Sequence, residues 1–125
     1  MISKIITALM VSSISLVAYS ADLSLKTVEG AKILDGNYHV KANKDRKTYS
    51  SSNGDISGKK ISKEVTLNKD GKSKTFKSDQ LITKGGNEYT VHFLGRQEGG
   101  HEHGYFQVKK ANKVVSRGMY NYSKQ

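Results

Sequence analysis

The clearest structural signal in the chain is the segment Glu88–Leu94, which has the sequence EYTVHFL. Tyr89, Val91 and Phe93 occupy every second position, and such alternation predicts a β-strand with one buried face. The residues between them, including His92, then face the opposite side of the sheet. We therefore expect this segment to be a central strand of a β-structure.

Shorter alternating or apolar segments occur along the rest of the chain. They are Leu23–Lys26, Tyr38–Ala42, Ile61–Leu67, Lys72–Lys77, Leu81–Ile82, Tyr105–Lys109 and Val114–Tyr122. Asp35–Asn37 and Asn68–Gly71 are turn signals between them, because Gly and Asn tolerate the positive φ of tight hairpin turns. No segment has the i, i+3, i+4, i+7 spacing of an amphipathic helix. The sequence predicts an all-β fold, a small antiparallel meander of about seven to eight strands forming a barrel or a sandwich.

Residues 43–60 interrupt this rhythm. The segment is rich in Lys, Ser, Asn and Gly, and its only large apolar residues are Tyr49 and Ile56. Connections of this length are usually either functional or disordered. We therefore expect a flexible loop over residues 43–60.

The first twenty residues have the three-part layout of a secretory signal peptide. Lys4 gives a positive start, residues 5–18 are nearly uncharged, and Ala18 and Ser20 place small residues before a cleavage site at Ala21. The apolar stretch is too short for a membrane span, which needs about 20 residues. We expect a cleaved signal-peptide helix over residues 1–20 and a single small secreted β-domain over residues 21–125.

The composition of the secreted part indicates where it acts. The chain has a formal charge of +10, which falls to +9 without Lys4, and it contains no cysteine. Small secreted animal domains usually strengthen a thin core with disulfides. A lysine-rich domain without them favours a bacterial exported protein, periplasmic or extracellular. No second apolar segment follows the leader, so no stable membrane insertion is expected after cleavage.

The most distinctive polar segment is Arg96–Gly104, with the sequence RQEGGHEHG, which we expect to be a loop between two strands. His101 and His103 point to the same side of an extended chain, and imidazole and carboxylate groups bind zinc and copper well. The candidate metal ligands are His101, Glu102, His103 and His92, with His39 as a further nitrogen donor. The alternatives are a merely solvated hairpin loop and a contact that depends on histidine protonation.

Basic residues gather on two predicted hairpins. They are Lys59, Lys60, Lys63, Lys72 and Lys74 on the first, and Lys109, Lys110, Lys113 and Arg117 on the second. Such a surface attracts an anionic polymer of the cell envelope or an acidic protein, although it can also serve only solubility and edge protection. Nucleic acid is not favoured, because only Tyr105, Tyr120 and Tyr122 are available to stack on bases.

Catalysis is the least favoured function. A ribonuclease would use Glu98 or His101 as base, His103 as acid and Arg96 on the phosphate, but a Gly-Gly loop does not hold such groups rigidly. No nucleophile elbow, zinc-binding helix or phosphate loop is present. The sequence favours a small exported non-enzymatic binding protein whose basic surface engages an anionic envelope polymer or a protein partner. A periplasmic zinc- or copper-binding protein is the first alternative, and a secreted ribonuclease is the second.

Overall fold

The computed structural model describes residues 20–124, so the predicted signal peptide lies outside the described residues except for Ser20. The strands are β1 (Ser20–Gly30), β2 (Gly36–Ala42), β3 (Thr48–Ser51), β4 (Ile56–Leu67), β5 (Lys74–Lys84), β6 (Asn87–Glu98), β7 (His101–Lys110) and β8 (Lys113–Lys124). No helix occurs among residues 20–124, which confirms the predicted all-β class. Consequently this part of the chain contains no helix long and apolar enough to cross a membrane.

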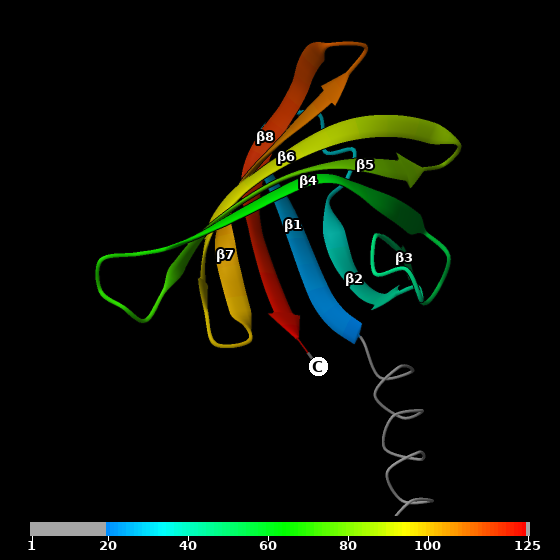
Figure 1. The fold of residues 1–125 in the computed structure, drawn as a ribbon. Helices are drawn as coiled ribbons and strands as arrows, with labels where there is room; N and C mark the ends of the chain where they lie inside the picture. Colours follow the sequence, from blue (N-terminus) through cyan, green and yellow to red (C-terminus); the bar gives the residue numbers. More distant parts are fainter. Residues whose placement is uncertain (1–19, 125) are drawn as a thin grey trace, which may run out of the picture.

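The eight strands form one ring-like antiparallel sheet (Figure 1). Each strand pairs with the next one along the chain, and β8 closes the ring on β1, where Tyr122 lies opposite Leu23 and Tyr120 opposite Leu25. Of the two predicted architectures, the strands therefore form the barrel. An eight-stranded barrel has an interior that side chains fill or that holds one small ligand.

Apolar side chains close one end of this barrel. Tyr89, Val91 and Phe93 of β6 are buried in the interior, as their alternation predicts. Towards the β1–β2 and β5–β6 turns, Leu34 and Ile82 are almost completely buried. Burying an apolar side chain of this size contributes about 1.5–3 kcal/mol. We call this end of the barrel, where the interior is packed, the closed end.

The segment 43–60 differs from the expected flexible loop, because it contains β3 and the first residues of β4. Its two large apolar residues, Tyr49 and Ile56, are both buried. The turn before β3 is organised by Asp45, whose carboxylate accepts the backbone N–H groups of Lys47 (2.9 Å) and Thr48 (3.0 Å). These bonds lower the pKa of the Asp45 carboxyl. The sequence pattern misses β3 because this strand is short and mostly polar.

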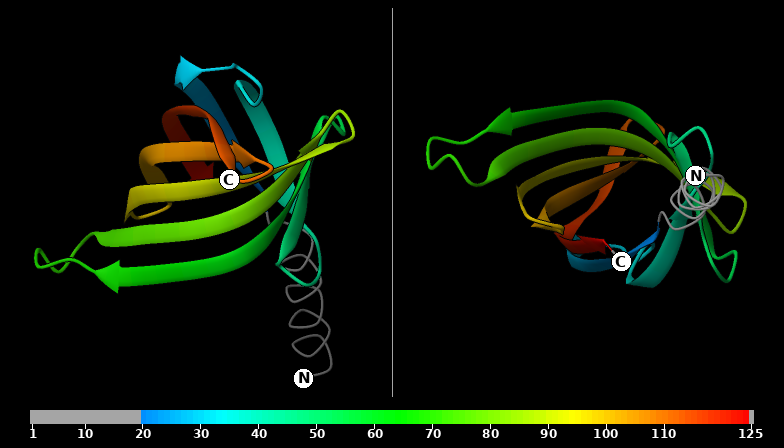
Figure 2. Two further views of the ribbon diagram at one scale, coloured as in Figure 1. Left: turned by 90° about the horizontal axis from the view of Figure 1, so that it is seen from above. Right: turned by 60° about the horizontal axis from the view of Figure 1, so that its bottom comes forward.

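The hairpin of β4 and β5 extends well beyond the rest of the barrel (Figure 2). Its turn is held by Asp70, whose carboxylate accepts the backbone N–H groups of Lys72 and Ser73, each at 2.9 Å. These two bonds are the main reason why the pKa of Asp70 falls to about 2. The predicted turn at Asn68–Gly71 is confirmed.

Candidate functional site: the open mouth of the barrel

The end of the barrel opposite the closed end contains a cavity that residues of all eight strands line, among them the first residues of β1 and the last residues of β8. Its floor is apolar and includes Leu23, Val40, Phe76 and Phe93. We call it the mouth cavity. Its floor residues come from four strands, so the closed ring is what brings them together.

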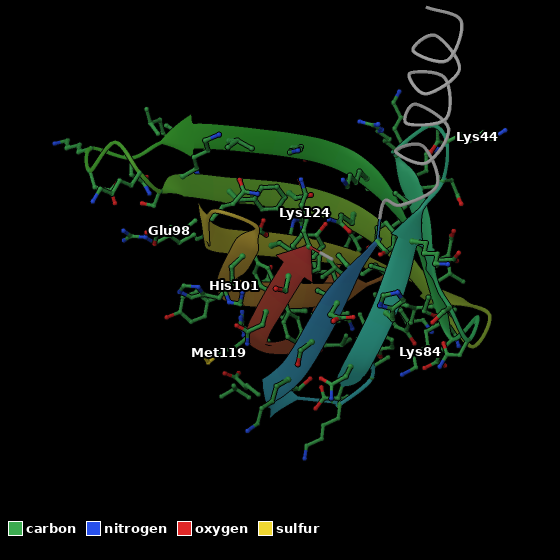
Figure 3. The ribbon with its side chains drawn as sticks, turned by 90° about the horizontal axis from the view of Figure 1, so that it is seen from below. Lys44, Lys84, Glu98, His101, Met119 and Lys124 are labelled. Carbon is green, nitrogen blue, oxygen red and sulfur yellow. The ribbon has the colours of Figure 1, made fainter. Side chains whose placement is uncertain are left out.

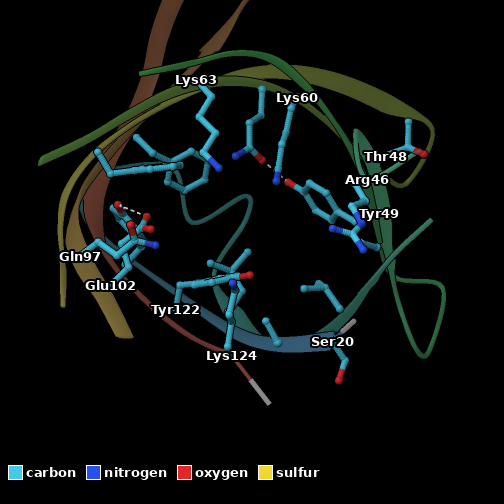
Figure 4. Close-up of a pocket in the computed structure, with 18 residues that line it drawn as sticks. Ser20, Arg46, Thr48, Tyr49, Lys60, Lys63, Gln97, Glu102, Tyr122 and Lys124 are labelled. Carbon is cyan, nitrogen blue, oxygen red and sulfur yellow. Dashed lines mark hydrogen bonds between the residues drawn. The ribbon is translucent and has the colours of Figure 1, made fainter. Parts of the chain in front are cut away.

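Four cationic side chains surround the mouth cavity. Lys60 and Lys63 extend into it from β4, Arg46 reaches it from the β2–β3 connection, and Lys124 from the end of β8 (Figure 4). Among residues 20–124, Glu102 supplies the one carboxylate that also lines the cavity. With that carboxylate ionised, the lining groups carry a net charge of +3, so their field attracts anions.

Glu102 projects from β7 into the barrel and is only 5% exposed. The hydroxyl of Tyr120 donates a hydrogen bond to its Oε2 at 2.6 Å. Burial raises the pKa of Glu102, while the Tyr120 hydrogen bond and the charges of Lys63 and Lys60 oppose this rise. Burial together with the Glu102 carboxylate raises the pKa of Tyr120, so the phenol stays protonated and remains a donor.

A second polar pair lies on another wall of the mouth cavity. The hydroxyl of Tyr49 donates to Oε1 of Gln80, whose Nε2 in turn donates to Ser78 Oγ at 3.1 Å. Burial raises the pKa of the Tyr49 phenol. Because these groups already bond to one another, they orient the wall of the cavity without needing a ligand.

The mouth cavity is small. Its volume, measured as the space open to the centres of water-sized molecules, is about 120 Å³. One water needs about 10–15 Å³ on this measure. The cavity therefore admits several waters, or the end of an organic molecule with a few carbon atoms.

The structure separates the predicted metal ligands. Glu102 faces into the barrel, whereas His101 and His103 lie on its outer face with ring centroids 6.2 Å apart. His92 lies on β6 and pairs with Asp79. His39 on β2 pairs with Asp22 at 2.8 Å. Among residues 20–124, no group of three or more His, Cys, Asp or Glu side chains is placed to hold a metal ion.

The reason for this separation is that the segment 96–104 is not the expected loop. β6 continues to Glu98 and β7 begins at His101, so only Gly99 and Gly100 form the turn. In a strand, successive side chains point to opposite faces. Glu102 is therefore directed away from the two histidines beside it.

The predicted basic surface is also divided. Lys60 and Lys63 line the mouth cavity, and Lys59, Lys72 and Lys74 lie on the same β4–β5 hairpin. The other predicted residues, Lys109, Lys110, Lys113 and Arg117, lie at the β7–β8 turn or near it. That turn is at the opposite end of β8 from Lys124, a distance of roughly 35 Å for a strand of this length. The nine residues therefore do not form one continuous surface.

Local partners occupy two of the cations near the β7–β8 turn. Lys110 Nζ donates to Asn87 Oδ1 at 3.0 Å and lies 5.4 Å from the centroid of the Tyr89 ring. Arg117 lies 3.5 Å from the carboxylate of Glu29. These contacts give both residues a structural role at the closed end.

The aromatic residues considered for base stacking are divided between the two faces of the sheet. Tyr120 is buried, and Tyr122 lines the mouth cavity. Tyr105 alone among the three lies on the outer face, with 64% of its surface exposed. Tyr105, Tyr120 and Tyr122 therefore do not form a row of exposed rings on which successive bases could stack.

The residues proposed for ribonuclease chemistry are neighbours on the outer face. Arg96 lies directly opposite His103, and Glu98 directly opposite His101. Figure 3 shows Glu98 and His101 on the outside of the ring that contains Lys124. None of the four lines the mouth cavity, and Arg96 is engaged with Asp70 at 2.8 Å.

Sequence reasoning missed two of the four mouth cations, Arg46 and Lys124. A signal for Lys124 was present, because it continues the inward alternation of Tyr120 and Tyr122 along β8. Arg46 has no comparable signal, since it lies in a connection and adopts a left-handed backbone with φ of 58°.

Comparisons of this chain with known protein families, with curated proteins and with solved structures found no match. The fold and the site therefore define only the class of protein, which is an eight-stranded antiparallel barrel with a cationic mouth cavity.

Proposed function

We propose that this chain is an exported, non-enzymatic binding protein whose mouth cavity binds the anionic end of a small amphipathic molecule. The observation that carries the proposal is the set of four cations around a cavity with an apolar floor. Ligand sites in proteins commonly combine an apolar lining with a few convergent polar groups. The charge selects an anionic group, and the floor selects a short apolar segment.

The cavity dimensions favour a small anion over a polymer. The four cations can orient a carboxylate or phosphate group, because charge-assisted hydrogen bonds are worth about 1.5–3 kcal/mol each. The cations at the closed end lie too far away to engage the same small ligand. An anionic envelope polymer or an acidic protein would instead need contacts along the outside of the barrel.

The export part of the proposal rests on the sequence. Lys4, the apolar residues 5–18 and the small residues before Ala21 support a leader that directs the β-domain out of the cytoplasm. The compartment in which the ligand would be met is the periplasm or the extracellular space.

The proposal is tested by calorimetry, with hexanoate as the probe and hexanol as an uncharged control of the same chain length. We expect hexanoate to bind with about one site per chain and hexanol to bind at least about tenfold more weakly, because only the carboxylate gains from the cations. Lys63→Gln should weaken hexanoate binding about tenfold, the equivalent of about 1.4 kcal/mol. Lys72→Gln, at the exposed hairpin turn, is the matched control and should change the affinity less than twofold.

Two results would contradict binding in the mouth cavity. Equal binding of hexanol and hexanoate would show that the cations do not select the ligand. Binding of a heparin fragment without any binding of hexanoate, equally weakened by both lysine variants, would favour the polymer hypothesis and a diffuse basic surface.

A second candidate function rests on the histidine pair of β7. His101 and His103 share the outer face with centroids 6.2 Å apart, close enough that small side-chain rotations would bring both imidazoles onto one zinc or copper ion. We expect at most one weak copper site per chain in a calorimetric titration, lost in His101→Ala and kept in His39→Ala. A titration in which both variants bind copper equally would exclude this pair as the site.

A further inference from the structure

The outer part of β4 has a neighbouring strand on one side only. β4 pairs with β5 as far as Leu67, which lies opposite Lys74, but β3 pairs with β4 only from Ser57 to Lys59. A register shift between Lys60 and Ser62 marks the point where the two-sided pairing ends. Beyond it, along Lys63–Leu67, β4 is an edge strand within the described chain, and Figure 2 shows it on the projecting hairpin.

The register shows which backbone groups face this edge. The N–H of Asn68 donates to the carbonyl oxygen of Ser73 at 2.9 Å, so Asn68 faces β5. In an antiparallel pair, successive residues direct their N–H and C=O groups alternately towards the partner strand and away from it. Thr66 and Glu64 therefore also face β5, whereas the N–H and C=O groups of Leu67, Val65 and Lys63 face the open edge.

Side chains on the same stretch are more apolar than an exposed edge usually carries. Val65 is 41% and Leu67 61% exposed, and Ile61 at the register shift is 56% exposed. Val65 lies opposite the buried Phe76 and so continues the inner face of the sheet outward. Exposed apolar residues on a long edge strand favour pairing with another extended chain.

Charge identifies the kind of chain that fits. Residues 59–77 contain seven lysines against two carboxylates, Glu64 and Asp70, a net charge of +5. A second copy of this chain would bring the same charge to the same edge and be repelled, which is how edge lysines prevent self-association. An acidic segment would be attracted by the same lysines.

We propose that the Lys63–Leu67 edge of β4 binds an extended acidic segment of a partner protein as an added β-strand. Main-chain hydrogen bonds to Lys63, Val65 and Leu67 would supply affinity, and alternate side chains of the added strand would supply specificity. Apolar residues of the segment pack on Val65 and Leu67. The carboxylates that alternate with them lie on the other face of the strand, where Lys77 and the lysines of the hairpin turn carry more charge than Glu64. The edge shares Lys63 with the mouth cavity, but the side chains that would contact the added strand most closely, Val65 and Leu67, do not line that cavity.

The test uses an acetylated and amidated peptide of four Val-Glu repeats as the probe, followed by amide hydrogen exchange and NMR shifts of the protein. We expect exchange at the Val65 and Leu67 amides to slow at least about tenfold with the peptide, and the Thr66 amide to change little because it already faces β5. The matched peptide of four Val-Lys repeats should bind at least about tenfold more weakly. A copy of the acidic peptide with N-methylated valines should lose binding.

Two variants separate the backbone contribution from the side-chain contribution. Val65→Pro removes an N–H that faces the open edge, a position at which proline is tolerated in edge strands, and should weaken peptide binding at least about tenfold while the far-ultraviolet spectrum stays unchanged. Val65→Thr keeps that N–H and should weaken binding less than Val65→Pro. If Val65→Pro does not fold, the N-methylated peptide carries the same test from the ligand side.

Three outcomes would overturn the proposal. One is an acidic peptide that leaves the Val65 and Leu67 amides unprotected at millimolar concentration. Another is equal binding of the acidic and basic peptides. The third is protection of these amides without peptide, accompanied by a dimer in sedimentation, because a second copy would then occupy the edge. Hexanoate binding in the mouth cavity is measured separately, so either proposal can fail alone.

Discussion

Replacing Gly104 by alanine is expected to lower the free energy of unfolding by at least about 3 kcal/mol, because overpacking against backbone cannot be relieved by a side-chain movement. A Cβ at Gly104 would lie 2.2 Å from the carbonyl oxygen of Leu94 and 2.4 Å from Cα of Gly95. Gly95 is the residue directly opposite on β6, so the two strands lie close together at a point where both lack a side chain. Any relief would therefore move β6 away from β7.

The matched control is Gly100→Ala, in the turn between the same two strands. A Cβ there would meet only Cβ of Lys124 at 3.6 Å, which is an ordinary contact. We expect its unfolding free energy to change by less than about 1 kcal/mol, and in a domain of this size 1 kcal/mol corresponds to about 4–8 °C in Tm. Thermal and urea unfolding of both variants measure the difference. Equal Tm values for the two variants would contradict the close approach of β6 and β7.

Because local alternation is what marks a strand in a sequence, most of the strands could be predicted. Tyr89, Val91 and Phe93 are buried as their spacing indicates, and the turn around Asp70 occurs where Gly and Asn place it. The turn expected at Asp35–Asn37 lies earlier instead, over residues 31–35, because Gly36 and Asn37 already belong to β2. β3 could not be predicted in this way. Its residues Thr48–Ser51 contain one large apolar side chain, Tyr49, and the strand exists because β2 and β4 offer it partners on both sides.

The mouth cavity could not be predicted, because its residues meet only when the ring closes. Lys60 and Lys63 show why the register matters. Simple alternation would direct residues three apart to opposite faces, yet both line the cavity, because the register shift between Lys60 and Ser62 inserts one extra residue into β4. β7 has no register shift beside Glu102, so simple alternation applies there. Predicting residues 101–104 as a strand would therefore have placed Glu102 on the opposite face from His101 and His103.

Glu102→Gln is expected to make the protein more stable than the natural chain at neutral pH, and equally stable at low pH. Burial raises the pKa of Glu102 above its ordinary value of 4.5. A carboxyl with a raised pKa in the folded state contributes its full stability below the ordinary value and loses it as the pH rises through the raised value. Glutamine avoids this loss and still offers an oxygen to the Tyr120 hydroxyl.

The same substitution should strengthen anion binding in the mouth cavity. Two unit charges about 8 Å apart interact by about 2 kcal/mol at an effective dielectric constant of about 20, so removing the Glu102 charge should raise hexanoate affinity by up to about thirtyfold. Glu98→Gln, which removes an exposed carboxylate from the outer end of β6, is the control and should leave both properties nearly unchanged. Tm of the three proteins measured from pH 4 to pH 8, with hexanoate titrations at pH 7, tests both expectations.

Whether Glu102→Gln raises or lowers the stability at neutral pH shows which force on the Glu102 carboxylate is larger, the cost of burial or the attraction by the cations. If the cost of burial dominates, the Tm difference between the variant and the natural chain grows as the pH rises. If attraction by Lys60 and Lys63 dominates, the variant is less stable at neutral pH, because those cations then face one another without the carboxylate between them. In that second case Glu102 would hold the cations together, and the mouth cavity would be tuned for a neutral or weakly acidic ligand instead of a strong anion.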